Sequence, residues 1–120
     1  MENLVANKKQ NVKCALTLLL ATFACSSSEV IWPKGGPPLN DYFSLEIKNE
    51  AYAAYNLKVD ADMPGHGHGM ITRPEVTTLE PGRWQVDGMI FHMPGLWELY
   101  LIWDLDGQTD REIQEILLEN

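Results

Sequence analysis

The distribution of hydrophobic residues along the chain predicts a series of short strands. From Phe43 to Lys48, hydrophobic residues alternate with polar ones, and a second two-residue alternation runs from Tyr55 to Asp60. This alternation is typical of strands that bury one face and leave the other in solvent. We therefore expect a half-buried strand over each segment.

Two similar turn motifs divide the segment that follows. Pro81-Gly82-Arg83-Trp84 and Pro94-Gly95-Leu96-Trp97 each place a Pro-Gly pair, suited to a type II turn, before an aromatic strand start. One strand, from Arg83 to His92, fits between the two turns. The second motif begins the most hydrophobic strand, which we expect to be central because both of its faces are apolar.

The last segment has two interpretations. Thr109-Asp110-Arg111-Glu112 has the form of a helix capping box, and hydrophobic residues follow it at helical spacing. However, an Asp106-Gly107 turn directly after a long buried strand favours return of the chain as a hairpin partner. We predict a strand.

Together these elements predict an all-β domain, an antiparallel β-sandwich, because strands and turns follow one another without a convincing helix. An eight-stranded barrel would need more chain. The expected core consists of the inward-facing strand residues: Phe43, Leu45, Ile47, Leu57, Val59, Trp84, Val86, Trp97, Leu99, Leu101 and Trp103.

The first 24 residues resemble a secretory signal peptide. Three lysines precede an uncharged run from Cys14 to Ala24, which is too short to span a bilayer. Cys25 is followed by three serines, as in a bacterial lipobox, and we predict lipidation there; cleavage to a soluble form is the alternative. Residues 25–41, rich in Ser, Gly and Pro, are expected to form a tether to a domain over residues 42–120.

Charge and composition exclude several classes of function. The chain has 9 Lys and Arg against 17 Asp and Glu, a formal net charge of -8, so no nucleic-acid partner is expected. Loss of residues 1–24 would remove three lysines and Glu2, leaving 6 basic and 16 acidic residues, a charge of -10. No paired nucleophile and base and no phosphate-binding glycine loop are evident, so we expect no enzyme activity.

The candidate chemistry lies in two short stretches. All three histidines and every methionine except Met1 fall within residues 62–70 or 89–95. Thioethers and neutral imidazoles are ligands that suit copper, and thioethers favour Cu(I) in particular. Glycines 65, 67 and 69 give the first stretch the freedom to fold around an ion. The candidate ligands are Met63, His66, His68, Met70, Met89, His92 and Met93.

Each stretch also has a simpler interpretation. The Gly-His-Gly-His-Gly run is compatible with a flexible solvent-exposed loop, and Met89 with an ordinary core residue. His92 and Met93 are adjacent, so on a regular strand they face opposite sides. We prefer His92 as the ligand, with Met93 or Met89 as the softer alternative.

The two motifs, Asp62 to Met70 and Val86 to Leu99, resemble the YtkA-like domain, which is related to FixH-like proteins and similar in build to CopC-like copper carriers. The resemblance covers about residues 42–118. It implies an exported immunoglobulin-like sandwich, often lipid-anchored, with roles in copper handling or oxidase assembly. The chain has no His at the expected mature N-terminus, where CopC-like proteins carry a Cu(II) ligand.

The sequence therefore predicts an exported copper-binding carrier or chaperone of the bacterial envelope or periplasm. Copper, preferably Cu(I), is the expected cargo, an envelope protein that receives it is the expected partner, and a lipid at Cys25 would supply the membrane anchor. The alternative is an adaptor module that docks onto an envelope complex without metal. The oligomeric state is left open.

Overall fold

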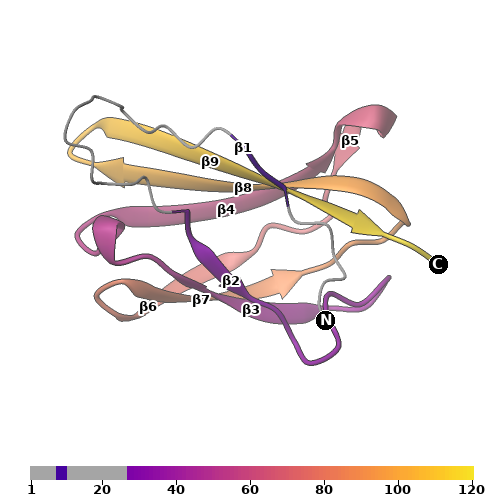
Figure 1. The fold of residues 1–120 in the computed structure, drawn as a ribbon, viewed down its shortest axis with the longest axis horizontal. Coiled ribbons are helices and arrows are strands. Elements are labelled where there is room, and N and C mark those ends of the chain that lie inside the picture. The colour runs from indigo at the N-terminus through magenta and orange to yellow at the C-terminus, as the bar shows by residue number, and fades with distance from the viewer. Residues whose placement is uncertain (1–7, 11–26) are drawn as a thin grey trace.

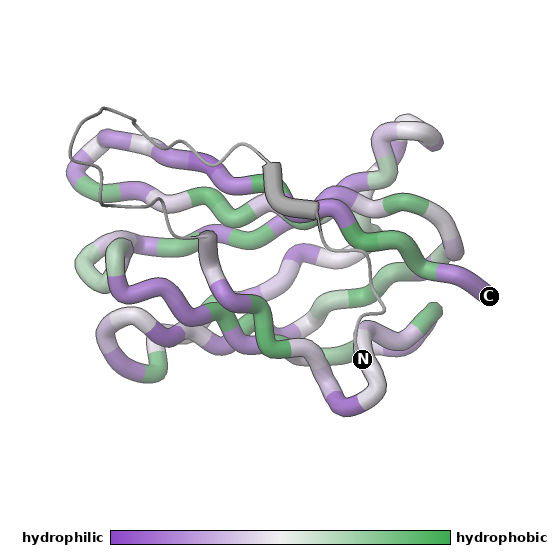
Figure 2. The backbone as a smooth tube through the Cα atoms, in the orientation of Figure 1, coloured by the Kyte–Doolittle hydropathy of each residue, from purple (hydrophilic) through white to green (hydrophobic). Residues whose placement is uncertain are grey.

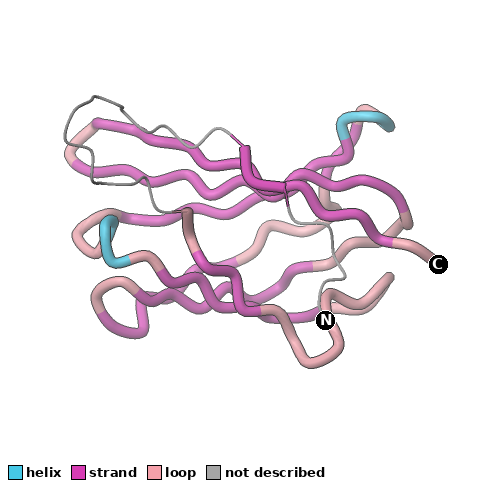
Figure 3. The backbone as a smooth tube through the Cα atoms, in the orientation of Figure 1, coloured by secondary structure: helices cyan, strands magenta, loops and turns pink. Residues whose placement is uncertain are grey.

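The computed structural model describes residues 8–10 and 27–120, and almost all of its regular structure is β-strand (Figure 3). Two single-turn 3-10 helices, η1 (Glu50–Tyr52) and η2 (Pro64–His66), interrupt the strands. The strands are β1 (Lys8–Gln10), β2 (Glu29–Ile31), β3 (Phe43–Lys48), β4 (Asn56–Met63), β5 (His68–Gly69), β6 (Glu75–Glu80), β7 (Arg83–Met89), β8 (Gly95–Leu105) and β9 (Gln108–Leu118).

The strands form two antiparallel sheets packed as a sandwich (Figure 1). One sheet has the order β1-β9-β8-β4-β5, and the other has the order β2-β3-β7-β6. The predicted all-β sandwich is confirmed. The strong hydrophobic strand, β8, lies between β4 and β9, so its predicted central position is confirmed as well.

The core lies between the two sheets, and alternating hydrophobic and polar segments are visible along the strands in Figure 2. All eleven residues predicted for the core are buried. The pattern missed several residues near strand ends and in connecting segments. These are Ala61, Met63, Met89, Ile90, Phe91, Ile116 and Leu118.

The C-terminal segment is a strand, as predicted, despite its helical spacing. Asp106 and Gly107 have φ values of 49° and 85°, the left-handed pair that a tight type I′ hairpin requires. The turn pairs Leu105 with Gln108, and the ladder continues to Gly95 and Leu118. Pairing along β8 therefore decides the conformation of β9 over its local helical preference.

The described part of the predicted tether belongs to the sandwich. Residues 29–31 pair with β3, and Val30, Trp32 and Leu39 pack against the core. Sequence composition suggested a linker because Gly and Pro are frequent here, yet the few apolar residues between them are enough to hold the segment. Cys25 and residues 11–26 lie outside the described residues, whereas Lys8–Gln10 pair with β9.

Two further differences concern the second sheet. The strand expected over Arg83 to His92 ends at Met89. Gly88, with a φ of 84°, lies where the register between β7 and β3 shifts, just before that end. The edge strand β6 was not predicted, because its residues are almost all exposed and show no clear alternation.

Within residues 8–10 and 27–120, no helix has the length and apolarity needed to cross a membrane.

Candidate metal centre

A short hairpin presents the first group of candidate ligands. At the end of β4, Met63 pairs with His68 of β5, and η2 forms the connection. The Gly67 N–H donates to the Met63 carbonyl at 3.0 Å, and Gly67 adopts a φ of 71°. A residue with a Cβ would be strained at that φ, so glycine is required for the turn that brings His66 and His68 together.

The second group arrives from the other sheet. The chain leaves β7 at Met89 and enters β8 at Gly95, so His92 lies in the connection between the sheets and not on a regular strand. Gly95 lies against the hairpin: a Cβ added there would be 2.8 Å from Met63 Cε and 3.9 Å from His66 Nε2. The two predicted stretches are therefore neighbours in space.

The three imidazoles lie close together. The ring centroids of His66 and His68 are 5.7 Å apart, and those of His68 and His92 are 5.3 Å apart. With metal–nitrogen bonds of about 2.0–2.1 Å, two imidazoles that share an ion at tetrahedral to trigonal angles have centroids roughly 5–6 Å apart. Both spacings are compatible with shared coordination, with His68 common to the two pairs.

An indole ring lies beneath two of the histidines. Trp97 is fully buried, and its ring centroid is 5.6 Å from that of His92 and 6.5 Å from that of His68. Its Nε1–H donates to the Met93 carbonyl at 3.0 Å, which fixes both the ring and the connection. The imidazoles thus rest on a rigid apolar surface, where electrostatic interactions are stronger than in bulk water.

The imidazole nitrogens have lone pairs available for a ligand. His92 Nδ1 is buried without a hydrogen-bond partner, and a buried nitrogen of this kind is costly unless something binds it. His68 Nδ1 lies 3.3 Å from the Gly69 carbonyl. If Nδ1 carries the proton and donates there, Nε2 is left unprotonated, which is the tautomer that a metal-binding histidine needs.

The candidate methionines separate into two kinds. Met63 and Met89 are both fully buried, but only Met63 ends the strand that leads into the histidine hairpin. Met89 pairs with Phe43 in the opposite sheet, although both methionines belong to the core. Met70 and Met93 are partly buried and pack against the core from the two connecting segments. Met63 is therefore the methionine best placed to act with His66.

Carboxylates lie beside the site on the outer face of the first sheet. Asp62 is paired with Glu98, and Glu98 accepts a hydrogen bond of 2.7 Å from the Tyr100 hydroxyl. Burial, together with this bond and the charges of Glu98 and Asp62, raises the pKa of Tyr100 to about 12. Because Asp62 is adjacent to Met63, its charge increases the local concentration of cations near the hairpin.

The site is not a ready-made centre of nitrogen and oxygen ligands. Among the residues that the structure describes, no three side chains of His, Cys, Asp or Glu are grouped so that they could hold a metal ion. An ion shared by these imidazoles would therefore need a thioether, or a change of rotamer, to complete its coordination. Such a donor set is soft, and it suits Cu(I) better than Ca²⁺ or Mg²⁺, which need several oxygens.

Sequence reasoning missed two residues that shape the site. Trp97 was expected only in the core, and Gly95 only in a turn; in the structure the first supports the imidazoles and the second leaves room for Met63 Cε. Both follow His92 within five residues, inside the Pro-Gly motif that begins β8. That closeness in sequence was the only signal available.

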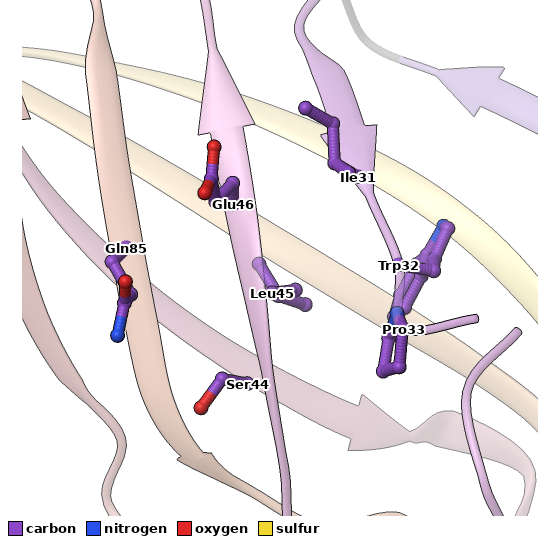
Figure 4. Close-up of a pocket in the computed structure, with 7 residues that line it drawn as sticks. All are labelled: Ile31, Trp32, Pro33, Ser44, Leu45, Glu46 and Gln85. Carbon is purple, nitrogen blue, oxygen red and sulfur yellow. The ribbon is translucent and has the colours of Figure 1, made fainter.

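A separate shallow groove of about 240 Å³ lies between the end of β2 and strands β3 and β7 (Figure 4). Its polar side chains are already engaged: Glu46 binds Arg83 at 2.9 Å, and Ser44 donates to Asp87. It contains none of the candidate ligands. The lining residues are Ile31, Trp32, Pro33, Ser44, Leu45, Glu46 and Gln85.

No protein-family model, curated protein or solved structure matches the chain.

Proposed function

We propose that the protein is a copper-binding carrier that holds Cu(I) between the histidine hairpin and the connection that carries His92. The single observation that carries this proposal is the 5.3 Å separation of the His68 and His92 ring centroids. These residues are 24 positions apart in sequence, and the spacing of their rings is compatible with a shared ion.

The chemistry of the donor set supports the cuprous ion. His66, His68 and His92 offer imidazole nitrogens, and Met63 offers a thioether that needs no deprotonation. None of these ligands is a thiol, so the set would survive in an oxidising compartment. Residues 64–67 of the hairpin are exposed, which is compatible with uptake and release of an ion by a carrier, and no catalysis is proposed.

The proposal also covers the family, export and membrane anchoring of the protein. We propose an immunoglobulin-like member of the YtkA-like group, exported after removal of residues 1–24 and anchored to the bacterial envelope through a lipid on Cys25. The antiparallel sandwich supports this kind of build. Delivery of copper to an envelope protein, including during oxidase assembly, is the corresponding biological role.

The test is titration of the purified protein with Cu(I) in competition with a chromogenic Cu(I) chelator. We expect a dissociation constant well below about 1 µM, corresponding to more than about 8 kcal/mol of binding free energy. The double variant His66→Ala, His68→Ala should lose at least about 100-fold in affinity because one imidazole pair is removed entirely. His92→Ala should lose affinity in the same range.

Two results would contradict the copper proposal: binding weaker than about 1 µM, or equal binding by the wild type and the double variant. The control is Met89→Leu, which alters a buried methionine of the opposite sheet and should bind as the wild type does. An adaptor that docks onto an envelope complex without metal would be favoured if copper binding is absent while a purified partner is retained.

A further inference from the structure

The described part of the segment predicted as a tether contacts Glu112 at its start and Phe91 further along. We call residues 28–40 the N-terminal strap. At its start, the backbone N–H and the hydroxyl of Ser28 donate to the Glu112 carboxylate at 3.0 and 2.7 Å. The strap then pairs with β3 through residues 29–31 and leaves the sheet at Pro33.

Two residues of the strap, Trp32 and Asn40, contact the connection that carries His92. The Trp32 ring centroid is 6.2 Å from that of Phe91, and the Asn40 N–H donates to the Phe91 carbonyl at 2.7 Å. Phe91 is fully buried and its ring also packs against Phe43 at 5.4 Å. Phe91 is therefore held by the strap through both its side chain and its backbone.

Phe91 in turn fixes the residue that follows it. The Phe91 ring lies 4.8 Å from the Trp97 ring, the same indole against which His92 packs. Because His92 Nδ1 has no hydrogen-bond partner, the orientation of its imidazole depends on this packing and on the backbone of the connection. The His68 ring, with its centroid 5.3 Å away, also contacts this imidazole.

We infer that the N-terminal strap is a positioning element for His92, and that Trp32 and Asn40 are positioning residues of the copper site although neither is a ligand. This inference rests on the proposed function for its consequence, a copper affinity that depends on residues of the strap. Outer residues that orient metal ligands commonly change affinity by about 10- to 100-fold when they are replaced.

The experiment compares four variants of the full chain. Trp32→Leu removes the ring from the Phe91 contact, whereas Trp32→Phe keeps an aromatic ring there. The matched control is Tyr52→Leu, because Tyr52 stacks on Trp103 at 4.4 Å near the other end of β8. Two quantities are measured: amide hydrogen exchange of residues 90–93 in metal-free protein, and the dissociation constant for Cu(I).

We expect Trp32→Leu to accelerate exchange of residues 90–93 and to weaken Cu(I) binding by about tenfold each. Trp32→Phe should stay near the wild type, and Tyr52→Leu should change neither quantity although it lowers the melting temperature. Asn40→Ala tests the backbone contact separately. Asn40 has a φ of 60°, a conformation that strains alanine. The hydrogen bond from the N–H of residue 40 to the Phe91 carbonyl should therefore weaken without loss of an aromatic ring.

Unchanged exchange of residues 90–93 in both Trp32→Leu and Asn40→Ala would overturn the inference, as would equal acceleration in Tyr52→Leu. Wild-type copper affinity in variants with faster exchange would overturn it too. If the wild type binds no Cu(I), the proposed function fails by itself. Exchange in the metal-free protein then still decides whether the strap holds the His92 connection.

Discussion

At the scale of single residues, position in the fold separates two methionines that the sequence could not rank. Met63 and Met89 are equally inaccessible, yet one borders His66 across Gly95 and the other packs in the opposite sheet. A methionine in an apolar segment has the same local pattern in either role, since both a core residue and a ligand lie beside hydrophobic neighbours. Only the three-dimensional position distinguishes them.

Conservative substitution of these two methionines tests the distinction. Leucine has nearly the volume of methionine, so each change should cost less than about 1.5 kcal/mol of unfolding free energy. Met63→Leu should weaken Cu(I) binding by about tenfold, or about 1.4 kcal/mol, because a thioether is lost, while Met89→Leu should leave it unchanged. Competition titration measures both, and a loss of affinity confined to Met89→Leu would exchange their roles.

Two tyrosines make the stability of the protein sensitive to alkali. Burial and a hydrogen bond to Asp110 raise the pKa of Tyr52, and burial and the bond to Glu98 raise that of Tyr100 to about 12, from an ordinary value of 10.0. The unfolded chain therefore releases these protons first. The stability they contribute is complete below pH 10 and is lost as the pH rises through the folded-state values.

The expected result is a fall in the free energy of unfolding between pH 10 and about 12, the window set by the Tyr100 pKa. The double variant Tyr52→Phe, Tyr100→Phe should show a shallower fall over the same window, because its unfolded chain no longer releases these two protons. Urea denaturation at successive pH values gives both curves. Equal slopes for the two proteins would show that other groups control alkaline unfolding.

At the scale of elements, a strand could be predicted from the sequence where hydrophobic and polar residues alternate clearly. β3, β4 and β8 have hydrophobic residues at every second position and were predicted, whereas β6 presents an almost fully exposed surface and was not. The N-terminal strap was mistaken for a linker because its buried polar anchor, Ser28, reads as an ordinary serine in a serine run. Its partner, Glu112, is 84 positions away.

The Glu112 anchor should be a strong stabilising element. Its carboxylate is only 4% exposed and accepts hydrogen bonds from Ser28 and from Gln114 Nε2 at 3.0 Å. Glu112→Ala would leave the buried N–H and hydroxyl of Ser28 without their acceptor, while Gln114 Nε2 keeps the Ser28 carbonyl at 3.2 Å. The change should cost about 3 kcal/mol of unfolding free energy. Glu75→Ala, at an exposed position on β6, should change stability by less than about 0.5 kcal/mol in the same urea denaturation. Similar losses in the two variants would contradict the role of the anchor.

At the scale of the whole molecule, the sandwich brings the two segments that carry the candidate ligands together from different sheets. The hairpin after β4 belongs to the first sheet, and the connection after β7 leaves the second (Figure 1). Their meeting was a prediction from the shared composition of two stretches, and the spacing of the imidazoles confirms the contact between them. The fold by itself assigns no function to this contact, because a β-sandwich supports many functions.

The excess of acidic residues adds a second property of the whole molecule. A formal charge of -8 on 120 residues attracts cations over a Debye length of about 8 Å at physiological ionic strength. This attraction is not selective, so it should favour arrival of any metal ion without deciding which one stays. In the proposed carrier, selectivity would come from the imidazoles and the thioether at the hairpin, which prefer a soft ion.

A ligand that binds only the folded state must stabilise the whole domain, and this separates a copper carrier from a metal-free adaptor. Cu(I) at a free concentration 100 times its dissociation constant should add about 2.7 kcal/mol to the free energy of unfolding. For a domain of this size, that increment raises the melting temperature by roughly 10 °C or more. The double variant His66→Ala, His68→Ala should show no such rise, whereas Met89→Leu should show all of it. An adaptor predicts the same melting curve with and without copper in all three proteins, since its partner, and not the ion, would be what binds the folded state.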